Sequence, residues 1–294
     1  MDNFETLSQE LLVGAYDLHT HTTPSHVSRA LDDFQLVQEA SQAKMAGVLI
    51  KSHYETTHAR AFTANRYAGG TAKAFGSIVL NWTVGGLNPF AVQNALDGGA
   101  SMVWMPTMDS KHCQVGSMGS FYTRKEGITV LDENGKLKPI VYDIFDLVKA
   151  HNVPLATGHI SPEESLILCR EGVAHGCRMI LTHPEWPKTT VPLELQCELA
   201  RMGVFIEKLW LNVAEGSVTA EYMAETMRQV GFDHAFLSTD RGQSGFEHPA
   251  EGLRKFITEL LRQGISPDDI KRMSQQTPKY LMNQQEKEKG RDQP

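Results

Sequence analysis

The 294-residue chain is 41% hydrophobic and 21% charged, a balance typical of a globular protein with a sizeable apolar core. Its formal net charge of −7 argues against nucleic acid as a partner, because no basic stripe is available to contact phosphates. No apolar run approaches the roughly 18 residues of a membrane span, and the polar residues 1–10 lack the features of a secretory signal. We therefore expect a cytoplasmic protein whose four scattered cysteines are reduced.

Short apolar runs alternate with amphipathic stretches along the chain. Several of these runs are continuous rather than alternating, as expected for parallel strands that are covered on both faces. The intervening stretches place apolar residues three or four positions apart, as amphipathic helices do. Ser161 followed by Pro162, with Glu164 three residues after the serine, indicates the start of one such helix. The apolar runs are 16–21, 47–53, 76–81, 101–106, 153–159, 178–183, 203–208 and 235–240.

Eight strands alternating with eight helices predict a (β/α)₈ TIM-like barrel, an α/β fold, as a single domain over residues 1–282. The fourth connection is longer than the others, so we expect an excursion after strand four at residues 107–139. Within it, Asn134 and Gly135 lie between two β-prone runs and predict a hairpin turn. The polar tail, residues 283–294, is expected to lie outside the barrel domain.

Residues able to bind a metal end several of the predicted strands. His19 and His21 end the first strand two residues apart, so their imidazoles point in the same direction. His159 and His183 end the fifth and sixth strands, and Asp240 ends the eighth. Imidazole nitrogens and a carboxylate suit zinc above all, and also manganese, iron or nickel. The five residues therefore predict a divalent metal site at the mouth of the barrel.

The order of these motifs resembles the amidohydrolase superfamily over residues 14–265. The resemblance implies a distorted (β/α)₈ barrel that holds one or two divalent ions and hydrolyses amides, esters or related bonds. It implies that His19, His21 and His159 bind the metal and that His183 either binds it or lies just behind the ligands. Asp240 would bind the metal and take a proton from the activated water.

The end of the fourth strand departs from that pattern. Two-metal members of the superfamily carry a bridging carbamylated lysine or a glutamate there, whereas this chain has Trp104 in Ser-Met-Val-Trp-Met-Pro. A site with one ion is the simpler interpretation. Lys51, two residues before His53 in the second strand, is a candidate catalytic or modified lysine, with a structural role as the alternative.

The opening Asp-Leu-His-Thr-His and the strand-two Ile-Lys-Ser-His also resemble the polymerase-and-histidinol-phosphatase (PHP) family of phosphoesterases. That resemblance implies a seven-stranded barrel with three ions. This chain has Ser52-His53 where the family has Asp-His, and Asp240-Arg241-Gly242 where it has Asp-x-His. Both differences weaken the three-ion interpretation, and His53 is kept as a candidate extra ligand or substrate contact.

Three further residues lie beside the strand ends. Glu207 ends strand seven and is expected either to orient a metal ligand, to contact substrate, or to pair with the adjacent Lys208. Trp186 is a candidate apolar wall of the pocket. Arg241 is a candidate for binding an anionic substrate group, with an ordinary salt bridge as the alternative.

We expect hydrolysis of an amide, ester or related C–N or C–O bond by a metal-activated water, with Asp240 as the base. His183 is expected to stabilise the oxyanion, with His53 and Lys51 as further candidates for that role. The alternatives are a metal-dependent decarboxylase on the same scaffold, a PHP-type phosphoesterase, and a binding barrel that the metal stabilises. The expected partner is a small-molecule substrate, with no nucleic acid and no membrane. A homo-oligomer is left open.

Overall fold

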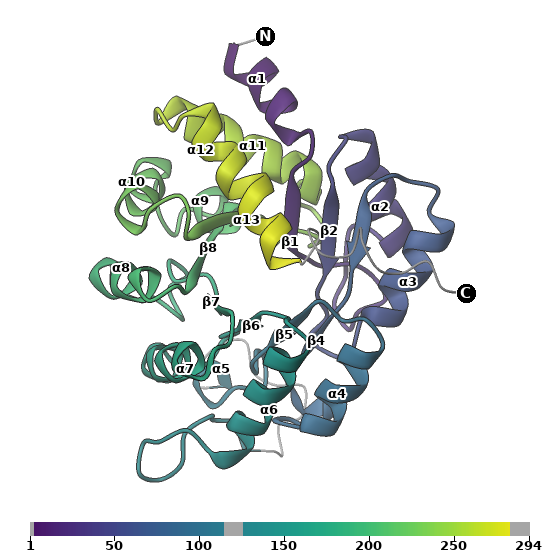
Figure 1. Ribbon diagram of the computed structural model, residues 1–294. Coiled ribbons are helices and arrows are strands. Elements are labelled where there is room, and N and C mark those ends of the chain that lie inside the picture. The colour runs from purple at the N-terminus through teal and green to yellow at the C-terminus, as the bar shows by residue number, and fades with distance from the viewer. Residues whose placement is uncertain (1–2, 115–125, 283–294) are drawn as a thin grey trace.

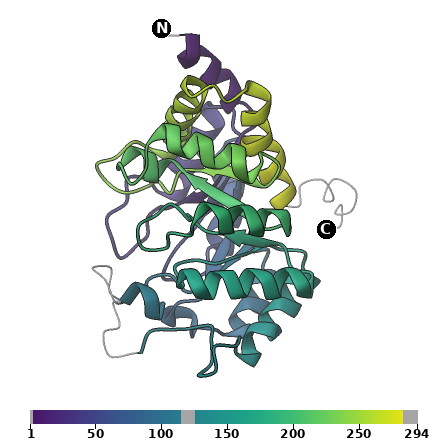
Figure 2. The ribbon, with the colours of Figure 1, turned by 90° about the vertical axis from the view of Figure 1, so that its left-hand side faces the viewer.

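The computed structural model of the protein describes residues 3–114 and 126–282. Within these ranges, parallel strands form a ring and helices cover its outer face (Figure 1). The N-terminal helix α1 (Asn3–Leu12) packs beside α11 (Pro249–Arg262), as Figure 2 also shows. The strands are β1 (Tyr16–Thr20), β2 (Gly47–Ile50), β3 (Lys73–Phe75), β4 (Ser77–Val79), β5 (Met102–Trp104), β6 (Leu155–Ala156), β7 (Met179–Leu181), β8 (Phe205–Leu209) and β9 (Ala235–Ser238).

The strands close into a barrel. Strands β3 and β4 are the two halves of one strand, since only Gly76 separates them and they pair with β2 and β5 respectively. The last strand meets the first through two backbone hydrogen bonds, from Asp240 N–H to the His19 carbonyl and from His21 N–H to the Arg241 carbonyl, each 2.9 Å. Over the described residues this makes an eight-stranded parallel barrel, which confirms the predicted fold class.

Helices occupy the connections between the strands. The predicted start at Ser161 is confirmed, because its side chain accepts from the Glu164 N–H and Pro162 takes the first helical position. Asp32 caps an earlier helix in the same way, with Gln35 as its reciprocal partner. The helices are α1 (Asn3–Leu12), α2 (Asp33–Gln42), α3 (His58–Tyr67), α4 (Pro89–Asp97), α5 (Lys111–Gln114), α6 (Pro139–Ala150), α7 (Pro162–His175), α8 (Leu193–Arg201), α9 (Trp210–Ala214), α10 (Ala220–Val230), α11 (Pro249–Arg262), α12 (Pro267–Lys271) and α13 (Thr277–Leu281).

Apolar side chains fill the interior of the barrel below its mouth. They come from the strands and from the end of α13, which supplies Leu281. This helix closes the end where the strands begin, since Arg178, just before β7, donates to the carbonyls of Tyr280 and Leu281. The pocket with the candidate site residues lies at the opposite end, where the strands finish and where barrel enzymes place their active sites.

A bulge in β1 turns its histidines into the barrel. Tyr16 and Leu18 already point inward, so strict alternation would place His19 outside. The register against β2 shifts between Asp17 and Thr20, where three residue steps of β1 match two of β2. The buried Asp17 carboxylate holds this segment by accepting from the backbone N–H groups of His19 and Thr239. Bulges commonly re-aim a side chain beside an active site, and here the bulge brings the His-x-His pair inside.

The predicted excursion after strand four contains α5 and a tight turn. Leu131 pairs antiparallel with Leu137, and Gly135 at the turn has φ 72°, so the hairpin turn is confirmed. Residues 115–125 of the excursion and the predicted tail, 283–294, lie outside the described residues. The four cysteines are free thiols. No helix in the described ranges is both long and apolar enough to cross a membrane.

Candidate metal and active site

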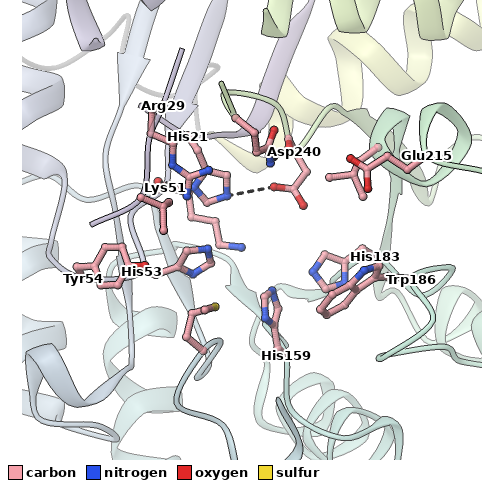
Figure 3. A pocket seen from close by; sticks show the side chains of 14 residues that line it. His21, Arg29, Lys51, His53, Tyr54, His159, His183, Trp186, Glu215 and Asp240 are labelled. Atoms are coloured by element: carbon pink, nitrogen blue, oxygen red, sulfur yellow. Dashed lines mark hydrogen bonds and ion pairs between the residues drawn. The ribbon is translucent and has the colours of Figure 1, made fainter. Parts of the chain in front are cut away.

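The ends of the strands surround a pocket of about 310 Å³ (Figure 3). Its lining combines side chains at the strand ends with residues of the segments that follow β1, β2, β5, β7, β8 and β9, so distant parts of the chain meet at one place. The lining residues are His21, Val27, Arg29, Lys51, His53, Tyr54, Met108, His159, His183, Trp186, Leu211, Glu215, Asp240 and Gln243.

Three of the five predicted metal ligands form a tight cluster. Asp240 Oδ1 lies 3.3 Å from His19 Nε2 and 3.1 Å from His21 Nε2. One ligand atom from each of the three residues lies within 4.8 Å of the other two. His19 is fully buried and His21 is 3% exposed, so the cluster faces water only through the pocket.

Hydrogen bonds behind the cluster fix which imidazole nitrogens face it. His19 Nδ1 donates to Glu207 Oε1 at 3.0 Å, and His21 Nδ1 donates to the Lys51 carbonyl at 3.0 Å. Each ring therefore turns its Nε2 lone pair toward Asp240. Metal-binding histidines are held in this way, with the second nitrogen donating to a carboxylate or a backbone carbonyl.

At physiological pH the His21 ring of this cluster is neutral and the Asp240 carboxylate is ionised. Burial, together with Arg29 and Lys51, lowers the pKa of His21 to about 3, so its ring is neutral at physiological pH. Burial by itself would raise the pKa of Asp240, but His19, His21 and Lys51 together hold it well below its ordinary value. Two imidazole lone pairs and a carboxylate oxygen thus converge, and this donor set suits a divalent cation.

Lys51 supplies positive charge at the same point. Its Nζ donates to His19 Nε2 at 2.8 Å and lies 4.3 Å from the centre of the Trp104 ring. The side chain is 1% exposed, and burial lowers its pKa to about 8. Trp104, where two-metal amidohydrolases carry a bridging ligand, packs its ring against the His19 ring and the Lys51 ammonium and offers no ligand atom to an ion.

The pocket histidines His53, His159 and His183 complete a ring of imidazoles. Burial lowers the pKa of each of them well below its ordinary value, so all three are neutral. His183 Nδ1 donates to the Thr189 hydroxyl at 2.9 Å, because that hydroxyl itself donates to the His183 carbonyl. Adjacent ring centroids are 4.9 to 6.0 Å apart in the order His19, His21, His53, His159, His183 and back to His19.

Glu207 contacts two of the histidines from behind, and Trp186 lines the pocket. Glu207 is fully buried, and its second oxygen accepts from the His183 backbone N–H at 3.2 Å, so one carboxylate positions two histidines. The alternative pairing with Lys208 is absent among the described contacts, since Lys208 pairs with Glu185 instead. Trp186 lines the pocket with its ring centre 5.1 Å from the rings of both His159 and His183.

Arg241 does not line the pocket, so it is not available to the substrate as a free cation. Its guanidinium is 1% exposed and pairs with Glu215 at 3.0 Å and Glu247 at 2.7 Å. The alternative interpretation, an ordinary salt bridge, therefore describes this residue. The arginine that faces the cavity is Arg29, in the loop after β1. The only signal for it in the sequence is its place after the His-x-His pair, on the same face of the barrel.

The backbone at two strand ends is strained, and a third position requires glycine. His183 and Asp240 have φ values of 30° and 53°, a region that residues other than glycine rarely adopt and that is common at functional sites. A β-carbon at Gly242 would lie 1.8 Å from the His21 carbonyl oxygen. The PHP pattern Asp-x-His would place a histidine there, so this backbone excludes it. The eight strands found in the described residues also differ from the seven that the PHP resemblance implies.

The barrel has the fold of the amidohydrolases. Similar solved structures are an amidohydrolase from Pseudomonas aeruginosa (12% identity, 95% of this chain and 99% of that chain covered, TM-score 0.62) and the probable dipeptidase PvdM from the same organism (11%, 96% and 98%, 0.64). A third is 2,6-dihydroxybenzoate decarboxylase from Rhizobium (12%, 93% and 99%, 0.52). At these identities the likeness concerns the fold.

The chain belongs to the family of unknown function DUF6282, whose model matches residues 14–207. The match ends at Glu207, so it includes the His-x-His pair, His159 and His183 and ends before Asp240. No curated protein matches the chain.

Proposed function

We propose that the protein is a metal-dependent hydrolase that cleaves an amide, ester or related C–N or C–O bond of a small molecule. The observation that carries the proposal is the cluster of His19, His21 and Asp240, in which three lone-pair atoms converge on one point at the end of a pocket. Lys51 donates to His19 Nε2, but the acceptors His21 Nε2 and Asp240 Oδ1 still face each other at 3.1 Å. Two buried acceptors in such contact repel unless a cation lies between them, so the arrangement favours a bound ion.

His19, His21 and Asp240 would hold the ion, with His159 and His183 as further candidate ligands from across the pocket. Zinc suits nitrogen and carboxylate ligands best, and manganese, iron or nickel are the other candidates. When bound, such an ion supplies Lewis acidity, which lowers the pKa of water toward neutrality and polarises a carbonyl.

Asp240 is proposed as the base. Its side chain is 17% exposed and faces the pocket, so an ionised carboxylate is within reach of a water molecule there. It would accept the proton from the attacking water and then deliver it to the leaving group. The strained φ of Asp240 holds this carboxylate at the pocket rather than along the strand.

Lys51 is a better candidate than His183 for stabilising the oxyanion. The neutral His183 ring uses its only N–H on Thr189, so it turns an acceptor toward the pocket. The Lys51 ammonium has three donors and lines the same cavity. Of the expected candidates for the oxyanion donor we therefore propose Lys51, and we keep His183 as a candidate metal ligand.

The test is a screen of purified protein, reconstituted with one metal at a time, against N-acyl amino acids, dipeptides, lactones and simple esters. A hydrolytic product that depends on metal and is lost in Asp240→Asn supports the proposal. Release of CO₂ without a hydrolytic product would assign the decarboxylase alternative instead. Equal rates in the chelated and reconstituted protein would refute metal dependence.

A further inference from the structure

The charges that line the pocket are partnered within the molecule, with one exception. Glu215 pairs with Arg241, Asp240 belongs to the histidine cluster, and Lys51 contacts His19. Arg29 pairs with no carboxylate of the described residues. Its Nε atom is shielded from solvent and has no hydrogen-bond acceptor within the described parts of the chain.

An unpartnered guanidinium at this place points to a missing ligand. A buried donor left without an acceptor is costly, and arginine donors are most often satisfied by the two oxygens of a carboxylate or a phosphate. Arg29 lies near the Lys51 ammonium and the candidate ligand His21. An unpaired guanidinium in this position is unfavourable unless an anion is bound during function. The same side chain acts electrostatically on Asp240 and His21, so it lies close to the proposed reaction centre.

The position of Arg29 is set by the backbone rather than by a flexible loop. Arg29 forms an antiparallel bridge with Gln243, and the next residue, Ala30, donates its N–H to the Gly242 carbonyl at 2.9 Å. The loop is also held at His26, whose ring stacks on Tyr54 with centroids 4.0 Å apart. A guanidinium anchored in this way binds an anion without first ordering its own loop, which favours affinity.

Across the pocket from Arg29 lies the aromatic ring of Trp186, on the side that also carries His183 and Glu215. Figure 3 shows Arg29, His21 and Lys51 on one side and Trp186 on the other. Leu211 and Met108 add to the apolar lining. The 310 Å³ cavity is at the small end of ligand sites. One cationic fork facing an aromatic wall fits a small acid with a single anionic group and an apolar body.

We propose that Arg29 binds a carboxylate of the substrate, so that the enzyme acts on small carboxylic acids whose apolar part lies against Trp186. This inference rests on the proposed function for its reaction, but not for its binding step. A carboxylate is favoured over a phosphate because a phosphate offers three oxygens to donors, whereas this side of the pocket offers one unpaired fork.

The test measures binding by calorimetry on chelator-treated protein, so that no ion can attract the anion. The probes are N-acetyl-leucine and N-acetyl-phenylalanine, the neutral primary amide of each, and phenyl phosphate. Wild-type protein, Arg29→Gln and Arg29→Lys are compared. Arg66→Gln, which removes the same charge from the exposed face of α3, is the control.

Wild-type protein and the Arg66 control should bind each acid about 10- to 100-fold more tightly than its amide, as expected for charge-assisted hydrogen bonds. Arg29→Gln should remove at least about tenfold of that preference, and Arg29→Lys should keep part of it.

An equal response to acid and amide in wild-type protein, including no binding of either, would overturn the proposal. So would an undiminished preference in Arg29→Gln, or an Arg29-dependent preference for phenyl phosphate over both acids. Failure of the hydrolase proposal is recognised separately, as absence of turnover in a metal-loaded protein that still binds acids through Arg29.

Discussion

Replacing Glu207 by glutamine tests whether a buried side chain behind the metal-binding histidines controls metal binding. Both carboxylate oxygens of Glu207 are acceptors, one from His19 Nδ1–H and one from the His183 backbone N–H. Glutamine has one acceptor and one donor group in the same shape. It can therefore satisfy only one of the two contacts in the present arrangement.

Each way of placing the amide has a cost. If its oxygen faces His19, its NH₂ group opposes the His183 N–H, and a buried donor is left unsatisfied at about 1–3 kcal/mol of unfolding free energy. If its NH₂ group faces His19, the imidazole must accept at Nδ1 and carry its proton on Nε2. That proton would occupy the nitrogen that faces Asp240, so His19 could no longer bind a metal ion.

We expect Glu207→Gln to bind zinc about 10- to 100-fold more weakly than wild-type protein, the usual cost of losing a partner behind a ligand. The assay is a competition titration of the chelated protein against a chromophoric chelator, with urea unfolding of the metal-free protein measured in parallel. Glu215→Gln is the control, because Glu215 also lines the pocket but contacts Arg241 rather than a histidine. Wild-type affinity for zinc in Glu207→Gln, with only its unfolding free energy reduced, would refute the argument.

Three other perturbations test the site. The double variant His19→Ala, His21→Ala should lose the bound ion, about one per chain in wild-type protein; unchanged metal content by elemental analysis would rule out the assigned ligands. Asp240→Asn should retain most of its metal yet lower kcat about 10²- to 10⁴-fold with a smaller change in KM, and near-wild-type turnover of the loaded variant would remove Asp240 as the base. Metal-free protein should lose stability as the pH falls below about 6.5, because burial lowers the pKa of His21 to about 3 and the pKa of each of the other pocket histidines well below its ordinary value. The unfolded chain then binds protons that the folded chain does not, at about 1.4 kcal/mol for each such histidine at pH 5.5, and an unfolding midpoint in urea that is the same at pH 7.5 and 5.5 would contradict this.

The architecture could be predicted from local patterns in the sequence. Continuous apolar runs, amphipathic stretches and the cap at Ser161 depend on neighbours within a few residues, and they predict parallel strands and helices directly. The candidate site residues could also be predicted, because the carboxyl end of each strand lies at the barrel mouth, whatever the position of that strand in the barrel. The sequence alone therefore predicts that His19, His21 and Asp240 lie together, as they do in the structure.

Only the tertiary structure decided how these side chains are aimed and paired. The inward direction of His19 depends on a bulge against β2, which alternation along β1 alone would have missed. The choice between Arg241 and Arg29 depends on Glu215 and Glu247, which neutralise one guanidinium and leave the other facing the cavity. A sequence records the charge of each residue, but whether a charge is free for a ligand depends on partners that folding brings from distant parts of the chain.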